Sequence, residues 1–322
     1  MISLKGYTSL IEKELQELSL PDSPEILYQT IRYFLNIGGK RIRPTLTLLA
    51  AELFGTDKRL AIPPALAIEL FHNFTLIHDD IMDAAPLRRG QTTVHEKWNT
   101  NTAILSGDIL MIISFQYLSK IDPNILPEAL FSFNKTATEV CEGQQMDMDF
   151  ESRNDVTIHE YIEMIRLKTS VLLGAALNLG ALVANASFKE RELLRIFGEN
   201  IGIAFQIQDD ILDLYADPTK FGKQVGGDVI ANKKTILHLS AVTKSSKEQL
   251  EIINQLQNEL DIEFKIQRTK EIFDHLKVKE ECVNQMDYHY NLALDALNSI
   301  KVSDDKKAPL IGLAKFLITR DL

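Results

Sequence analysis

The sequence predicts an all-α fold, and two observations lead to that prediction. Apolar residues recur at helical spacing along most of the chain, and only 15 glycines and 10 prolines interrupt its 322 residues, which leaves strands little room. No linker rich in Pro, Gly or Ser divides the sequence. We therefore expect one domain over residues 1–322, although this length exceeds that of a typical domain.

Helix start signals and long apolar segments indicate about twelve helices. The start signals are Ser23 before Pro24 and two capping-box patterns, Thr157 with Glu160 and Ser246 with Gln249. Long, mostly apolar helices are predicted over residues 61–83, 102–119, 125–150, 158–185 and 189–214. A helix that is apolar all round is buried, so these should form the core. Residues 247–300 predict amphipathic helices without a motif, which we interpret as scaffold.

Two nearly identical acidic pentapeptides, DDIMD at 79–83 and DDILD at 209–213, each follow an apolar segment. Residues three and four apart share a helix face, so the carboxylates of each motif should project together. Like charges at this spacing destabilise a helix and raise one another's pKa, which indicates a cation that offsets them. Oxygen ligands with room for water suit Mg²⁺. The residues concerned are Asp79, Asp80, Asp83, Asp209, Asp210 and Asp213.

One such motif alone could also be a solvated, acidic helix end. A surface helix, however, carries an apolar stripe on one side only. The residues around both motifs are too apolar for that arrangement. We therefore expect the aspartates to line an interior cleft.

Short basic blocks supply the opposite charge. Residues 38–44 (GGKRIRP) place three cations behind two glycines, which allow close backbone approach. Arg88 and Arg89 follow the first acidic motif, and Lys223 and Lys233 follow the second. Arg offers planar bidentate donors to phosphate and Lys a compact charge. The blocks would suit a substrate with two phosphates, although each alone could be a solvated basic patch.

Together these motifs resemble those of the trans-isoprenyl diphosphate synthases, the polyprenyl synthetase family, from about Gly38 to Thr235. The resemblance implies an isoprenoid synthase fold, a helical bundle around a large central cavity. It implies a prenyltransferase that condenses isopentenyl diphosphate head-to-tail with dimethylallyl, geranyl or farnesyl diphosphate as the allylic substrate. The expected product is an all-trans polyprenyl diphosphate, and the departing diphosphate takes the final proton.

The same resemblance implies a role for each candidate site residue. The six aspartates would bind three Mg²⁺ ions across the allylic diphosphate. The residues implied to bind isopentenyl diphosphate are Lys40, Arg43, His72 and Arg89. Those implied to bind the allylic diphosphate or to stabilise the developing carbocation are Arg88, Lys168, Thr169, Gln206, Lys223 and Lys233.

Three of these residues also have a local interpretation. His72 lies two helical turns before Asp79 and could reach the cleft, although a lone His on an apolar helix is usually a core residue. Lys168 interrupts an apolar helix. A buried Lys is costly unless paired, so we expect an anionic partner or a side chain that snorkels to the surface. Gln206 lies one turn before Asp210, where its amide could bond a carboxylate or a phosphate.

Product length is predicted from a stripe on the helix that ends in the first acidic motif, formed by Phe71, Phe74 and Thr75. On spacing alone, ordinary core packing is the commoner explanation of such a stripe. In the family that the chain resembles, a bulky aromatic residue five positions before the first aspartate marks short-chain enzymes, and Phe74 has that position. We therefore expect C15–C20 products, with the stripe as the floor of the tail pocket.

The composition of the chain argues against several other functions and locations of the protein. A net charge of −10 and a pI near 5.3 argue against nucleic-acid binding. Cys141 and Cys282 have no metal-ligand spacing and indicate reduced thiols. The sequence shows no signal-peptide pattern, and no apolar run approaches the length of a spanning helix. We expect a cytoplasmic protein without a transmembrane segment and, from the resemblance, a homodimer.

Other functions fit the sequence less well. A class I terpene cyclase shares the fold, but its second metal motif is usually of an Asn/Ser/Glu type and it needs no isopentenyl diphosphate site. A non-catalytic subunit should have lost site residues, and none is lost. A Ca²⁺-binding helical protein needs a loop of the type Asp-x-Asp-x-Asp-Gly, which is absent. A long-chain synthase is the alternative within the family.

Overall fold

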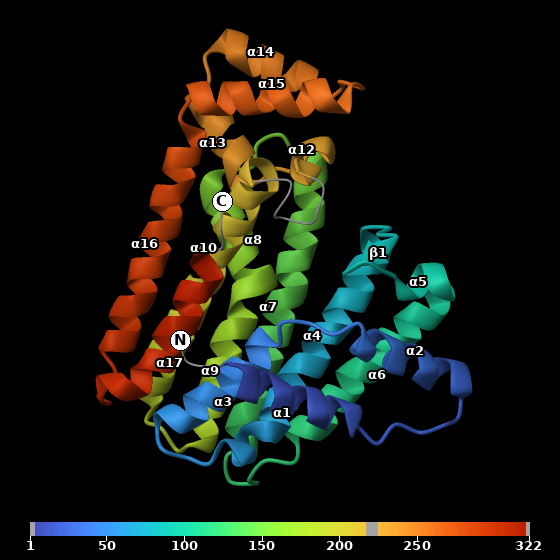
Figure 1. Cartoon of the computed structure of the whole chain (residues 1–322), viewed down its shortest axis with the longest axis vertical. Coiled ribbons are helices and arrows are strands. Elements are labelled where there is room, and N and C mark those ends of the chain that lie inside the picture. Colours follow the sequence, from blue (N-terminus) through green and yellow to red (C-terminus); the bar gives the residue numbers. More distant parts are fainter. Residues whose placement is uncertain (1–3, 217–224, 320–322) are drawn as a thin grey trace. The chain divides into compact units, whose positions relative to one another are not determined.

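The computed structural model describes residues 4–216 and 225–319. Helices form nearly all regular structure in these ranges, where the only sheet is a two-stranded antiparallel hairpin (Figure 1). The predicted all-α class is confirmed. The chain divides into two compact units, while the single domain over 1–322 and the central cavity stay predictions. The first unit comprises Met1–Asn134, Ala175–Glu192 and Val302–Pro309, and the second Lys135–Gly174, Leu193–Lys301 and Leu310–Leu322.

The first unit is built around α4 (Ile62–Met82), which packs against α3 (Ile42–Leu53) and α6 (Thr100–Leu118). Prolines in the first turn of α4 are tolerated because that turn needs no backbone N–H donors. Helix α2 has Pro24, not Ser23, at its N-cap, and no side chain caps it. The other elements are α1 (Lys5–Gln16), α2 (Glu25–Asn36), η1 (Lys58–Ala61), β1 (Leu87–Arg88), β2 (Gln91–Thr92) and α5 (Val94–Lys97).

In the second unit, α13 (Ile236–Lys244) packs against α16 (Val278–Asn298) and α15 (Ile262–His275), and α14 (Lys247–Leu256) lies against α15 (Figure 1). Both predicted capping boxes are present, at the start of α8 (Ile158–Ile165) and of α14. The short α12 (Gly227–Ile230) packs on α15. Helices with residues in both units are α7 (Leu126–Ser152), α9 (Val171–Val183), α10 (Phe188–Tyr215) and α17 (Asp304–Ile318).

Two helical stretches among the described residues, Lys58–Met82 and Ile158–Val183, are long and apolar enough to cross a membrane by length and composition. Their apolar windows are 67% and 83% buried by the protein itself. Buried core helices of soluble proteins share this composition. Both stretches therefore fit the core role predicted for them.

The helix predicted over 158–185 is not continuous. A π-helical turn, η2 (Arg166–Ser170), separates α8 from α9. The hydroxyl of Ser170 donates to the carbonyl of Ile165 at 3.2 Å, across the wider spacing of this turn. Single π-turns inside α-helices are rare and are often found at functional sites.

Glycines on two neighbouring helices make room for η2. A Cβ at Gly143 of α7 would lie 2.2 Å from the backbone nitrogen of Lys168, and one at Gly202 of α10 would lie 2.6 Å from Cβ of Ser170. Neither space could hold a methyl group without movement of the backbone or of a packed side chain. Main-chain contact between α7 and η2 therefore requires glycine at position 143.

Gly143→Ala should lower the free energy of unfolding by about 1 to 3 kcal/mol, because the added methyl group overpacks a backbone contact. Denaturant unfolding of the purified variant measures this change. Gly312→Ala is the matched control, since Gly312 also lies in a helix but a Cβ there meets nothing within 4 Å. Equal stability of the Gly143 variant and the wild type would contradict the close contact.

Candidate active site

Helix α4 presents the first acidic motif at its C-terminal end. Asp80 is only 1% exposed, and Nε of Arg88 lies 2.8 Å from each of its carboxylate oxygens. Asp79 is half-buried and Asp83 is exposed. The structure thus pairs the middle aspartate with an arginine inside the protein, whereas the outer aspartates are more open to solvent.

Arg88 and Arg89 belong to the β1–β2 hairpin. The two turn residues, Arg89 and Gly90, have φ values of 52° and 75°, as a type I′ turn requires. The turn brings the guanidinium of Arg89 over Gly39, where a Cβ would lie 2.7 Å from its Nη1. Gly39 therefore makes room for an arginine side chain.

The three cations of the 38–44 block have different surroundings. Arg41 adopts a left-handed backbone (φ 47°), and its side chain, 1% exposed, pairs with Glu69 at 2.6 Å and with Glu12 at 2.7 Å. Lys40 is exposed. Arg43 lies with Nη1 at 3.1 Å from Nε2 of His72. Only two of the three cations are thus placed to meet a ligand, and Arg41 is a structural residue.

Positive charge accumulates around His72. Burial and the nearby guanidinium groups, first that of Arg43, hold the pKa of His72 well below its usual range, so the imidazole is neutral and can accept from Arg43. Burial lowers the pKa of Arg43 to about 10, and Arg89 adds repulsion. The buried Nε of Arg43 has no hydrogen-bond partner among the described residues. This cluster, Arg43, His72 and Arg89, is suited to an anion.

The second acidic motif lies near the end of α10 in the second unit. Asp210 is buried and accepts from the hydroxyl of Tyr161, from Nε2 of Gln206 at 3.3 Å and from the backbone nitrogen of Ile236 at 3.4 Å. Burial, and then the charge of Asp228, raise the pKa of Asp210 to about 7. Of the two partners considered for the Gln206 amide, a carboxylate and a phosphate, the structure shows the carboxylate.

A fourth carboxylate, Asp228, joins this motif from the start of α12. Its backbone nitrogen donates to Asp213 at 2.9 Å, and burial together with Asp213 raises the pKa of Asp228 to about 6. Asp147 and Asp209 add to the repulsion, and Lys233 opposes it. Asp228 is the last residue of the sequence FGKQVGGD at 221–228. The glycines of this sequence are the feature by which the site residue could have been found.

A pocket opens beside these carboxylates, within the second unit. Asp210, Asp213 and Asp228 form its acidic part, and Lys233 and Lys265 also line it. Helices α13, α14 and α15 contribute apolar side chains such as Leu237, Ile253 and Phe273.

Lys168 and Thr169 are placed by the π-turn. The ammonium group of Lys168 lies 2.5 Å from a carboxylate oxygen of Asp147, so the predicted anionic partner exists. Lys233 is exposed. Lys223 lies outside the described residues. Lys234, which sequence reasoning did not assign, donates to the carbonyls of residues 150 and 151 at the C-terminal end of α7, where a cation is favoured.

The donor set fits Mg²⁺, a hard cation that prefers carboxylate oxygens. Crowding of buried carboxylates, visible in the raised pKa values of Asp210 and Asp228, is the electrostatic problem that a divalent cation would relieve. No three acidic, His or Cys side chains within 4–216 and 225–319 are grouped as a complete metal cage. Mg²⁺ commonly takes one or two carboxylates and completes its shell with phosphate and water.

The proposed floor of the tail pocket belongs to a cluster of aromatic rings. Phe74 packs edge-on against Phe71, at 5.4 Å between ring centroids, and against His78, at 4.8 Å. Phe71 also packs against Phe133 at 5.3 Å. Thr75 donates to the carbonyl of His72. Phe133 comes from a helix distant in the sequence, so no local pattern could identify it.

Two DDxxD motifs near helix ends, each with cationic side chains nearby, are the arrangement that the resemblance to prenyltransferases implies. Residues 24–276 match the family model described as polyprenyl synthetase. The chain therefore belongs to the polyprenyl synthetase family, and it is an enzyme, a short-chain trans-prenyltransferase.

Individual relatives agree with this family. The chain is 40% identical to a geranylgeranyl diphosphate synthase of Methanosarcina mazei, over 99% of this chain and 97% of the relative. It is 42% identical to a geranylfarnesyl diphosphate synthase of Natronomonas pharaonis, over 72% of this chain and 73% of the relative. The crystal structure of geranylgeranyl pyrophosphate synthetase from Pyrococcus horikoshii superposes with a TM-score of 0.93 at 35% identity, covering 99% of this chain and 97% of that one.

Arg41→Met should cost about 3 to 5 kcal/mol of unfolding free energy, because it leaves the buried carboxylate of Glu69 without its ion pair. Chemical denaturation provides the measurement. Arg59→Met is the control, since Arg59 and its partner Asp57 are largely exposed and a surface pair contributes little. A similar small loss in both variants would refute the structural role of Arg41.

Proposed function

We propose that this prenyltransferase condenses isopentenyl diphosphate with an allylic diphosphate to give a C15–C20 all-trans product. The observation that carries the proposal is the cationic cluster Arg43, His72 and Arg89 in the same unit as the first acidic motif, since it suits a second anionic substrate. The names of several relatives support geranylgeranyl diphosphate as the product. The Natronomonas relative is named for a product one isoprene unit longer.

Isopentenyl diphosphate would bind to Lys40, Arg43, His72 and Arg89. Neutral His72 accepts from one arm of the Arg43 guanidinium and so orients it. The buried Nε of Arg43 has no hydrogen-bond partner among the described residues, so it can donate to a phosphate oxygen. Arginine suits bidentate bonds to phosphate. Lys40, exposed beside Gly39, can add a compact charge.

The allylic diphosphate would bind to Arg88, Lys168, Thr169, Gln206, Lys223 and Lys233. Bound Mg²⁺, for which we propose three ions on the six aspartates, supplies Lewis-acid stabilisation of the leaving diphosphate. Arg88 and Lys168 add preorganised positive charge. The Thr169 hydroxyl and the Gln206 amide are neutral dipoles, which can stabilise the allylic cation without reacting with it.

In each acidic motif the middle aspartate would act as a support. Arg88 holds Asp80, and Tyr161 with Gln206 holds Asp210, so the geometry of the motif is fixed before any ligand arrives. Groups held in place before binding cost less to organise in the transition state.

We also propose a homodimer in the cytoplasm. Helix α6 is apolar on all sides, and its Ile104, Leu105 and Ile112 are 40%, 55% and 49% exposed. The same surface of a second copy would cover these side chains. Cys141 and Cys282 form no disulfide, which suits a reducing compartment.

Asp79→Ala or Asp209→Ala should lower turnover at least about 10²-fold, because each removes support for charge on the leaving group. The assay contains Mg²⁺, isopentenyl diphosphate and, in turn, the C5, C10 and C15 allylic diphosphates, with chromatography of the products. Asp155→Ala is the control, an exposed aspartate that pairs with Arg153 outside the site. Undiminished turnover of either motif variant, or a wild type without condensing activity, would defeat the proposal.

Phe74→Ala should lengthen the product by one or more isoprene units, because it removes a ring that limits the tail pocket. Its cost in stability should be below the roughly 3 to 5 kcal/mol of a Phe→Ala change in a closed core. Phe197→Ala, at a residue 1% exposed, gives that reference cost and should leave product length unchanged. Product chromatography and a melting curve decide between pocket floor and core. Unchanged products with a core-sized loss of stability would assign Phe74 to packing.

A further inference from the structure

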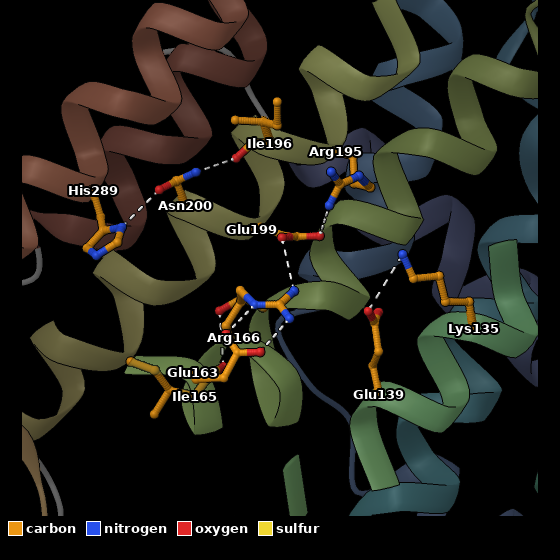
Figure 2. A network of polar contacts seen from close by, with 11 residues as sticks. Lys135, Glu139, Glu163, Ile165, Arg166, Arg195, Ile196, Glu199, Asn200 and His289 are labelled. Atoms are coloured by element: carbon orange, nitrogen blue, oxygen red, sulfur yellow. Dashed lines mark hydrogen bonds and ion pairs between the residues drawn. The ribbon is translucent and has the colours of Figure 1, made fainter. Parts of the chain in front are cut away.

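The π-turn η2 begins at an arginine held by two carboxylates. Nε and Nη2 of Arg166 donate to the two oxygens of Glu163 at 2.8 and 2.7 Å, and its Nη1 donates to Glu199 at 3.4 Å. Arg195 forms a second ion pair with Glu199. Figure 2 shows Arg166 between the two carboxylates and Glu199 between the two arginines. The network joins η2 to the helix before it and to α10.

This network lies in a partly dry environment. The side chains of Arg166 and Glu199 are 26% and 12% exposed. A Cβ at Gly174 would lie 3.1 Å from Cγ of Glu199, so the carboxylate stem packs directly on that glycine. The bonds to Glu163 raise the pKa of Arg166, which therefore stays charged. The pair of Arg166 with Glu199 is shielded in this way and is stronger than one on the surface, whereas the side chain of Glu163 is 40% exposed.

Two other side chains of η2, those of Lys168 and Ser170, are held as well. Ser170 bonds to the carbonyl of Ile165, and Gly143 and Gly202 admit the turn between α7 and α10. Lys168 pairs with Asp147. Contacts at the beginning, middle and end of the turn thus hold three of its five side chains.

A π-turn needs such support because it competes with the α-helix, which is favoured for the same residues. One residue corresponds to about 100° of rotation around an α-helix. Loss of the π-turn would therefore rotate Lys168 and Thr169 away from their present direction, by about that angle relative to the helix that follows.

We propose that Arg166, held by Glu163 and Glu199, is a positioning residue that keeps η2 in its π-helical form and so aims Lys168 and Thr169 at the allylic substrate. The proposal rests on the proposed function of those two residues. A purely stabilising ion pair would lower the melting temperature without a selective effect on one substrate.

Arg166→Ala tests the proposal against Arg153→Ala as the matched control. Arg153 also forms two ion pairs in this unit, with Asp155 and Glu160, but at the start of α8 and not at η2. For Arg166→Ala we expect kcat/KM for the allylic diphosphate to fall about ten- to a hundredfold, the effect of a misplaced binding group. The KM for isopentenyl diphosphate should stay unchanged, and Arg153→Ala should alter neither constant.

Two further variants keep the test decisive if Arg166→Ala does not fold. Glu199→Gln retains the size of the side chain and removes only its charge, so it should give a weaker form of the same allylic effect. Arg166→Lys keeps the charge without the bidentate geometry, and it should restore part of the lost kcat/KM.

Amide hydrogen exchange over residues 166–171 separates this inference from the proposed function. We expect faster exchange there in Arg166→Ala and not in Arg153→Ala. If Lys168→Ala leaves allylic kinetics unchanged, the role of Lys168 fails, while faster exchange would still show that Arg166 holds η2. If Lys168→Ala impairs the enzyme but folded Arg166 and Glu199 variants match the wild type in kinetics and exchange, the positioning role is overturned.

Discussion

A charged group buried in a helical protein must find an opposite charge or hydrogen-bond donors, since leaving it unpaired costs several kcal/mol, on the order of 3 to 5 for a broken buried pair. The candidate active site depends on that constraint. In the first unit, Arg88 satisfies Asp80 and Arg41 satisfies Glu69. In the second, Tyr161, Gln206 and a backbone nitrogen satisfy Asp210. The bonds to Asp80 and Asp210 hold acidic side chains near the ends of α4 and α10, whereas the pair with Glu69 lies in the middle of α4.

The same bonds give the two acidic motifs a common design. Each motif has a buried middle aspartate bound to protein groups, while its outer aspartates are less buried. A carboxylate that protein donors already occupy has fewer lone pairs for a metal. The bonds to the middle aspartate therefore hold each motif in its orientation.

Periodicity and motif spacing predicted much of this structure. The long helices agree with α4, α6 and α10 to within about two residues, because long apolar segments give strong signals. The anionic partner of Lys168 follows from a burial argument on a single residue, and the position of Gln206 one turn before Asp210 allowed its bond to that carboxylate. These helices and side-chain contacts could be predicted because the signals for them lie within a short stretch of the sequence.

The features that sequence reasoning missed depend on residues far apart in the chain. The π-turn exists because glycines on α7 and α10 admit it, and nothing within 158–185 announces them. Arg41 pairs with Glu12 and Glu69 inside the protein, and charge counting cannot detect these distant partners. Tyr161 donates to Asp210, and Phe133 packs on Phe71, from positions far away in the chain that no local pattern could reveal.

The cationic cluster has a consequence for the free protein. Arg43 is half-buried, Arg89 is exposed but close enough to repel it, and His72 stays neutral beside Arg43. The repulsion within this cluster lowers the stability of the free protein. Functional sites often have such a cost, which a bound anion would relieve here. A diphosphate that binds there replaces repulsion by attraction, so part of its binding free energy should appear as stabilisation of the first unit. The proposed binding of isopentenyl diphosphate at this cluster would couple substrate recognition to the local stability of α3 and α4 through the guanidinium of Arg43.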